Sequence, residues 1–264
     1  MKKKILLILF ASTFAWGNLS SEEQPAGDAG KKLSYNLALD FGTTYLWRMN
    51  DTYAPALKDQ TSLFPFAPGI FPSVTINAGS EWAFNIWGAR SLLYRDVQQG
   101  ELKSYDEVDF TGTYTVKDNS GTFAGSLIGY VFPTTGSAGL TPSYAEMVFG
   151  YTAPFELLNP SITIAAAMAP ASALATEYAN ISISHEFAAG ILKFTPKILF
   201  GYWYYNADSA LNKGHVDVML PVSVAINDKF EVHAMIDGCW RTFGFDPKYA
   251  PFILVGTLGA SFTF

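Results

Sequence analysis

The 264-residue chain has a single cysteine, few charged residues and, beyond its first residues, no long apolar run. Because Cys239 is alone, an internal disulfide framework and a multi-cysteine metal site are both excluded. Charged residues make up 15% of the chain, well below the roughly 25% of ordinary soluble domains. Without an apolar run of eighteen residues, the body of the chain has no segment with the sequence of a membrane-spanning helix.

The N-terminus has the composition of a secretory signal peptide. Three lysines follow Met1, and an apolar run and the small residues Ala15 and Gly17 come next. The run is shorter than the ~20 residues that a spanning helix needs, and no cysteine follows it that could carry a lipid anchor. We therefore expect a signal peptide over residues 1–17, a disordered polar leader over 18–32 and a single domain over 33–264.

The charge balance excludes one class of partner, and the abundant residue types suggest a fold class. Without the three N-terminal lysines, 14 basic residues remain against 23 acidic ones, a net charge of −9. Nucleic acid is therefore not expected as a partner. Hydrophobic residues make up 49% of the chain and aromatic ones 16%. With so few charges, this combination favours a membrane or all-β protein.

Apolar and polar residues alternate along most of the chain after residue 32. In HVDVMLPVSVAI, residues 215–226, every second residue is valine, leucine or isoleucine. A β-strand places two such sets on opposite faces, whereas a helix mixes them. Twelve strands are predicted on this basis: 33–49, 70–78, 81–92, 104–116, 122–132, 143–151, 161–169, 176–187, 191–206, 215–226, 229–241 and 252–264.

The connections between these segments alternate in length. Short ones such as Gly79–Ser80 and Asn227–Asp228 alternate with longer ones such as Leu93–Lys103 and Thr242–Pro251. This pattern, with an even number of strands, predicts a monomeric, transmembrane, antiparallel up-and-down β-barrel of about twelve strands. The expected location is the outer membrane of a Gram-negative bacterium, in contact with its lipid and lipopolysaccharide, with both termini in the periplasm.

A soluble periplasmic β-sandwich or lipocalin-like barrel is the alternative fold, and it would bury the apolar face instead. Two features favour the membrane barrel. Large aromatic residues such as Tyr35, Trp82 and Trp240 lie near strand ends, where membrane interfaces would be. Acidic residues crowd the opposite face, where they would avoid lipid.

The polar face is predicted to line a channel through which small polar solutes diffuse. Twelve strands fall between the ~8 whose interior is filled and the ~16 that leave a wide aqueous channel. Glu186 is expected opposite Lys193 across a turn at Ala189–Gly190, and to form an ion pair with it. The predicted pore-lining residues are Asp40, Arg48, Glu107, Asp109, Glu146, Glu186, Lys193, Lys197, His215, Asp217, His233 and Asp237.

The role of the acidic residues on this face is left open by the sequence. Rings of charge set the selectivity of pores, so Glu107, Glu146, Asp217 and Asp237 could favour cations. Equally, these residues could line an ordinary hydrated lumen and be neutralised, with Arg48 and Arg90 as counter-charges.

No catalytic residue, cofactor or metal site is predicted. Ser184 and His185 point to opposite faces of a strand, and His215 and His233 lie near opposite ends of theirs, too far apart for one metal. An outer-membrane lipase with a serine and a histidine is the alternative enzyme class. A third class is a non-conducting structural or adhesive barrel that acts through the loop Asn50–Gly69, although this loop could instead constrict the lumen.

Six ordered stretches resemble one family of outer-membrane barrels: TTYLWR, FNIWGARS, EVDFTGTYT, GYVFP, YAEMVFGYT and EYANISISHEF. Together they resemble the TorF-like porin family, also known under the Gcw_chp label. The resemblance extends over about residues 33–264, and it departs where Met49 follows Arg48 in place of the usual glycine. It implies a porin-like barrel, but it indicates neither a substrate nor catalytic residues.

The chain ends in LGASFTF, an alternating strand that reaches its last residue. Leu258, Ala260, Phe262 and Phe264 are expected to face lipid, as the outer side of the strand that closes the barrel. The terminal phenylalanine resembles the C-terminal signal that the barrel-assembly machinery of Gram-negative bacteria recognises. Phe262 and Phe264 are therefore predicted as the assembly signal, with that machinery and periplasmic chaperones as partners.

Overall fold

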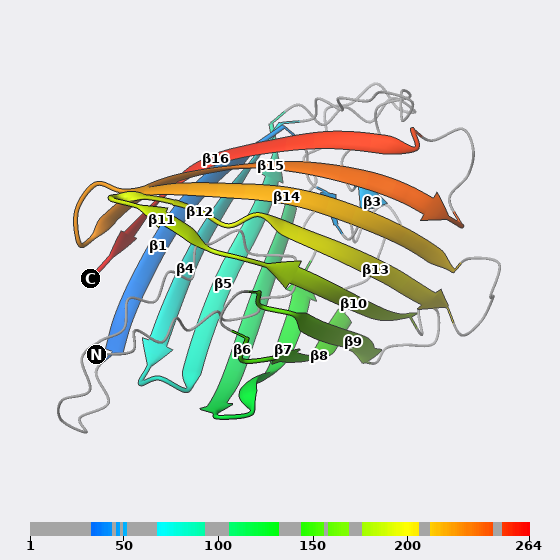
Figure 1. Cartoon of the computed structure of the whole chain (residues 1–264), viewed down its shortest axis with the longest axis horizontal. Coiled ribbons are helices and arrows are strands. Elements are labelled where there is room, and N and C mark those ends of the chain that lie inside the picture. The colour runs from blue at the N-terminus through cyan, green and yellow to red at the C-terminus, as the bar shows by residue number, and fades with distance from the viewer. Residues whose placement is uncertain are drawn as a thin grey trace.

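The computed structural model describes residues 33–43, 46–47, 50–51, 68–92, 106–131, 144–155, 158–168, 176–205, 212–244 and 250–264. These residues form one large antiparallel sheet that curls and closes on itself (Figure 1). Closure joins the two ends of the sequence, because Leu39 pairs with Ala260 between the first and last strands. The predicted signal peptide and leader lie outside the described residues. In the part of the chain that is described, no helix is long and apolar enough to cross a membrane.

Neighbouring strands in the barrel are also neighbours in the sequence. The strands are β1 Leu33–Gly42, β4 Gly69–Ala78, β5 Trp82–Ser91, β6 Asp106–Asp118, β7 Gly121–Val131, β8 Tyr144–Thr152, β9 Ser161–Met168, β10 Thr176–Ser184, β11 Phe187–Ala189, β12 Leu192–Phe194, β13 Lys197–Tyr205, β14 Lys213–Ala225, β15 Phe230–Phe243 and β16 Phe252–Thr263. This order is the up-and-down topology predicted from the sequence.

Two of the twelve barrel strands are interrupted. β10 and β11 form one strand broken at residues 185–186, and β12 and β13 form another broken at residues 195–196. The register stays constant across both breaks, since Ser184 pairs with Lys197 and Phe187 with Phe194. Pro196 stands at the second break, and it has no N–H to donate to a neighbouring strand. Counted this way, the closed barrel has the twelve strands expected.

The first predicted strand is too long. β1 ends at Gly42, and residues 46–47 (β2) pair instead with residues 50–51 (β3) in a separate small sheet. The reason is that β1 loses its partner on one side. Gly42 pairs with Gly69, the first residue of β4, so the adjacent strand does not extend further. The other predicted strand boundaries agree with the structure to within a few residues.

The short connections gather at the end of the barrel where β1 begins and β16 ends (Figure 1). Leu33 pairs with Ala78 beside the β4–β5 turn, and Thr263 pairs with Asn36. Two of these turns contain glycines with left-handed backbones, Gly79 with φ 72° and Gly190 with φ 64°. Glycine adopts this conformation without the steric cost that a Cβ brings.

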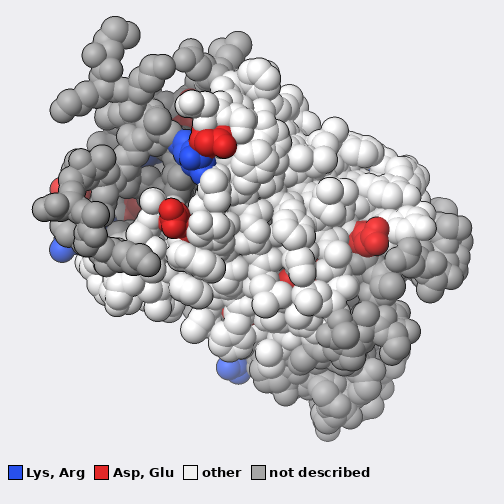
Figure 2. Space-filling model, turned by 90° about the horizontal axis from the view of Figure 1, so that it is seen from below, with Lys and Arg blue, Asp and Glu red and all other residues white. Residues whose placement is uncertain are grey.

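The outer face of the barrel is apolar. Large side chains at alternate strand positions are exposed there, among them Leu39, Phe84 and Ile181, and the face seen in Figure 2 has few charged residues. A surface of this kind is unfavourable in water and suits lipid. Exposed aromatic residues lie at both strand ends: Trp82, Tyr114, Phe123 and Phe262 on the side of the short turns, and Tyr204, Trp240 and Phe243 on the other.

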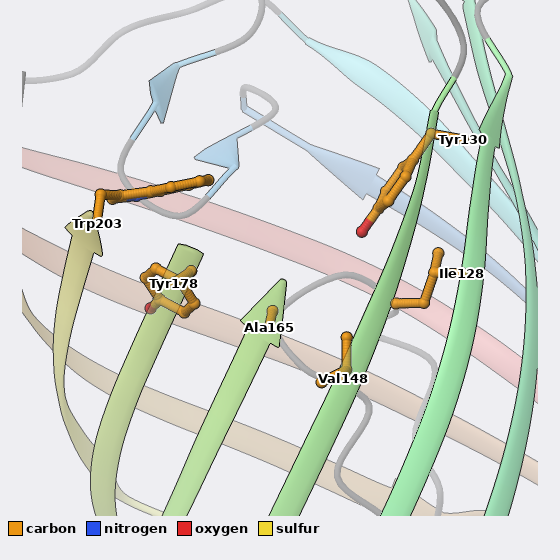
Figure 3. Packing of buried hydrophobic residues seen from close by; sticks show 6 residues of the cluster. All are labelled: Ile128, Tyr130, Val148, Ala165, Tyr178 and Trp203. Carbon is orange, nitrogen blue, oxygen red and sulfur yellow. The ribbon is translucent and has the colours of Figure 1, made fainter. Parts of the chain in front are cut away.

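The inner face contains an apolar cluster that the sequence pattern did not predict. Six buried side chains from β7, β8, β9, β10 and β13 point into the barrel (Figure 3). They are Ile128, Tyr130, Val148, Ala165, Tyr178 and Trp203. In the predicted strand 122–132, glycine and apolar residues fall on both faces, so the sequence pattern does not show which set faces inward. The structure turns Ala124, Ser126, Ile128 and Tyr130 inward, while Phe123 and Leu127 face out.

Candidate functional site: the charged inner wall

Most of the predicted pore-lining residues are buried at inward positions of the barrel wall. Most of their neighbours along each strand are more exposed apolar residues, such as Leu39 and Phe41 on either side of Asp40, so the alternation fixes which side each one faces. The buried ones are Asp40, Glu107, Asp109, Glu146, His215, Asp217, His233 and Asp237. Glu186, Lys193 and Lys197 are half-buried. Arg48 lies outside the described residues.

An acidic cluster lies on β6 and β8. It consists of Glu107, Asp109 and Glu146, and the two glutamates lie close enough to Asp109 to act on its charge. The Tyr130 hydroxyl donates a hydrogen bond of 2.9 Å to Oε2 of Glu146. The inner wall is therefore strongly acidic beside the apolar cluster.

A second polar contact spans the strand that closes the barrel. Asp40 on β1 and His233 on β15 both pair with Gly259 on the intervening strand β16. Oδ1 of Asp40 and Nε2 of His233 lie 2.5 Å apart in a buried hydrogen bond. A Cβ at residue 259 would meet both side chains. The glycine is what allows these two residues to meet across a strand.

A third polar contact joins β10, β13 and β14, and here too a glycine lies where the side chains meet. The Tyr178 hydroxyl is 3.2 Å from Nε2 of His215, and Nδ1 of His215 is 3.1 Å from Oδ1 of Asp217. Gly201 pairs with His215, and a Cβ there would meet the ring of His215 and the hydroxyl of Tyr178. The result is a buried chain of tyrosine, histidine and aspartate.

Asp217 also belongs to a cluster on β13, β14 and β15. One ligand atom from each of Asp217, Asp237 and Cys239 lies within 4.8 Å of the others. The ammonium of Lys197 is attracted to both carboxylates. Two carboxylates, a thiol and an ammonium thus converge on one area of the inner wall.

Two predicted charge partners are wrong. Lys193 pairs with Ala188, and Ser184 pairs with Lys197, because the β11–β12 turn is centred at Gly190–Ile191 rather than at Ala189–Gly190. This shifts the register by two residues, and among the described residues no ion pair joins Glu186 to Lys193. Arg90 is exposed next to the inward Ala89, so it faces outward and is not a lumen counter-charge.

Three inner-wall residues were missed as members of polar contacts. Tyr130, Tyr178 and Cys239 are not among the pore-lining residues predicted from the sequence. A signal was present, since His215 and Asp217 on one strand and Asp237 and Cys239 on the next have the i, i+2 spacing of one face. The register that sets them side by side is a tertiary property.

Solved structures of other proteins share the fold of this barrel. The NanC porin superposes with a TM-score of 0.56 over 86% of this chain and 98% of that one, at 9% identity. The fold is that of outer-membrane porin-type β-barrels. LpxR from Salmonella typhimurium superposes with a TM-score of 0.50 over 86% of this chain and 99% of that one, at 6% identity. At such identities the likeness concerns the fold alone.

Sequence comparisons add no family. No family model matches the chain, and no curated protein matches it. The resemblance to the TorF-like family therefore stays a prediction.

Proposed function

We propose that this chain is an outer-membrane channel through which small polar solutes diffuse passively, with a preference for cations. The observation that carries the proposal is the contrast between the two faces of a closed barrel. The outer face exposes apolar side chains, and the inner face holds the buried carboxyl groups of Asp40, Glu107, Asp109, Glu146, Asp217, Asp237 and others. Side chains on the inner face of a barrel determine what passes through it.

The proposed orientation follows from connection length. The short turns share one end of the barrel with the start of β1 and the end of β16, and we place this end and both termini in the periplasm. Outer-membrane lipid and lipopolysaccharide would surround the apolar outer face. The barrel-assembly machinery and periplasmic chaperones would deliver the chain to the membrane.

Purified protein inserted into planar lipid bilayers is expected to show stepwise increases in conductance. Each step would report one barrel that opens an aqueous path. The control is the same preparation after heat unfolding. A correctly folded barrel that stays silent would contradict the channel and leave a structural or adhesive role.

The acidic inner wall is expected to make the channel cation-selective. The variant Glu107→Gln, Glu146→Gln, Asp217→Asn removes three inward negative charges and keeps amide groups for the hydrogen bonds to Tyr130 and His215. Under a salt gradient, its reversal potential should fall towards that of an unselective pore.

A matched control removes the same charge elsewhere. Glu81, Asp118 and Asp228 are exposed at the short turns, and their triple neutralisation should leave the reversal potential almost unchanged. Equal reversal potentials in the wild type and both triple variants would refute the selectivity proposal.

The alternative function, an outer-membrane lipase, requires a different set of contacts. A serine–histidine lipase needs a serine hydroxyl bonded to the histidine, whereas the described hydroxyl partner of His215 is Tyr178. Release of fatty acid from outer-membrane lipid by a silent barrel would favour this class over the channel.

A further inference from the structure

Three possible metal ligands lie together on two adjacent inner-wall strands. Asp217 on β14 pairs directly with Cys239 on β15, and Asp237 precedes Cys239 by two residues on the same face. One ligand atom from each lies within 4.8 Å of the other two. In the described part of the chain, no other group of three histidine, cysteine or acidic residues meets this condition.

One of these ligands has an unsatisfied oxygen. Asp237 is more than nine-tenths buried, and its Oδ1 has no hydrogen-bond partner among the described residues. Buried polar atoms are almost always satisfied, and leaving one without a partner destabilises the fold. The Cys239 thiol is close to both aspartates, but a thiol is only a weak donor.

A divalent ion would balance the charge of the site. If the cysteine is deprotonated, the three ligands carry three negative charges, and the Lys197 ammonium attracted to both carboxylates supplies one positive charge. An ion of charge +2 brings the total to zero.

From this geometry we propose that Asp217, Asp237 and Cys239 bind a zinc-class divalent metal ion on the inner wall of the barrel. A thiolate with two carboxylates suits Zn²⁺ or Co²⁺, whereas Ca²⁺ and Mg²⁺ prefer oxygen ligands alone. Three protein ligands leave a fourth position for water or solute. His215 bonds to Oδ1 of Asp217 and so orients that ligand, as outer-shell partners in metal sites do.

The proposal goes beyond the channel and does not require it. Metal binding is measured on the folded barrel in detergent, where conductance has no part. A barrel that conducts but does not bind metal, and one that binds metal but is silent, are therefore distinguishable results.

The test is titration of the folded, untagged barrel with Co²⁺, followed by absorption spectroscopy. Thiolate bound to Co²⁺ gives a charge-transfer band in the near ultraviolet that carboxylates alone do not give. The expected result is one equivalent of Co²⁺ with this band, which Zn²⁺ displaces and excess Mg²⁺ does not. Cys239→Ser should abolish the band, and Asp237→Asn should weaken Co²⁺ binding by at least about tenfold.

Asp109→Asn is the matched control, because it removes a buried inward carboxylate from the separate acidic cluster and should leave the band intact. Absence of the band in the wild type, or its persistence in Cys239→Ser, would overturn the proposal. A second measurement does not depend on how the variants fold. Zn²⁺ should slow the reaction of a small thiol reagent with Cys239 in the wild type, and an unchanged rate would equally overturn the site.

Discussion

Gly259→Ala is expected to lower the free energy of unfolding by about 3 kcal/mol, in the range measured when a buried ionic pair is broken. A Cβ at residue 259 would occupy the place where Asp40 and His233 meet, so their hydrogen bond would have to break. The two polar groups would then stay buried without each other. The measurement is thermal unfolding of the detergent-folded barrel, with the mobility shift of unheated samples on gels as a second readout.

The control for this variant is Gly129→Ala on β7. A Cβ at residue 129 has no atom within 4 Å, so this variant tests the general effect of alanine for glycine in a strand. A double-mutant cycle isolates the mechanism. In an Asp40→Ala background, Gly259→Ala should cost little, because the pair it disrupts is already gone. Equal stability losses at residues 129 and 259 would contradict the role given to Gly259.

Deletion of Phe264 is expected to remove most of the folded barrel from the outer membrane while export and signal-peptide removal continue. Phe264 closes the barrel by three contacts with Tyr35. Its N–H donates to the Tyr35 carbonyl, its carbonyl accepts from the Tyr35 N–H, and the two rings stack at 5.7 Å. Loss of the residue removes the last pairing between the first and last strands and the aromatic side chain predicted as an assembly signal.

Two further variants separate these effects. Phe264→Ala keeps both backbone hydrogen bonds, so a defect in this variant would come from the aromatic ring. Phe123→Ala removes another exposed aromatic residue from the same end of the barrel, and it should assemble normally. The readout is the amount of heat-modifiable barrel in outer-membrane fractions. Normal assembly without Phe264 would count against the signal.

The strand pattern explains why so much of the fold was predictable. One face of a barrel strand contacts lipid and the other faces the enclosed interior. Apolar and polar residues must therefore alternate along each strand. The final strand shows this well, since Ile253, Val255 and Ser261 are buried while Leu258 and Phe262 are exposed, as the sequence indicates. Alternation does not fix where a strand loses its partner, and for this reason residues 43–49 were wrongly joined to β1.

The candidate site was predictable only in part, for a similar reason. The sequence placed Asp217, Asp237 and His233 on the inner face, because facing depends on position within one strand. It did not show that Asp40 meets His233 or that Asp217 meets Cys239, because such meetings depend on register between strands. A shift of two residues was enough to separate Glu186 from its predicted partner Lys193.

The sequence by itself determined the fold class, the number of strands and the face on which most side chains lie, because these follow from local alternation and from the lengths of turns. The tertiary structure decided which polar groups touch. Closure brings Asp40 and His233 to either side of Gly259, and the pairing of β14 with β15 brings Asp217 to Cys239. Residues far apart in the sequence become neighbours only when the hydrogen-bond register of the whole barrel is set, and no local pattern contains that register.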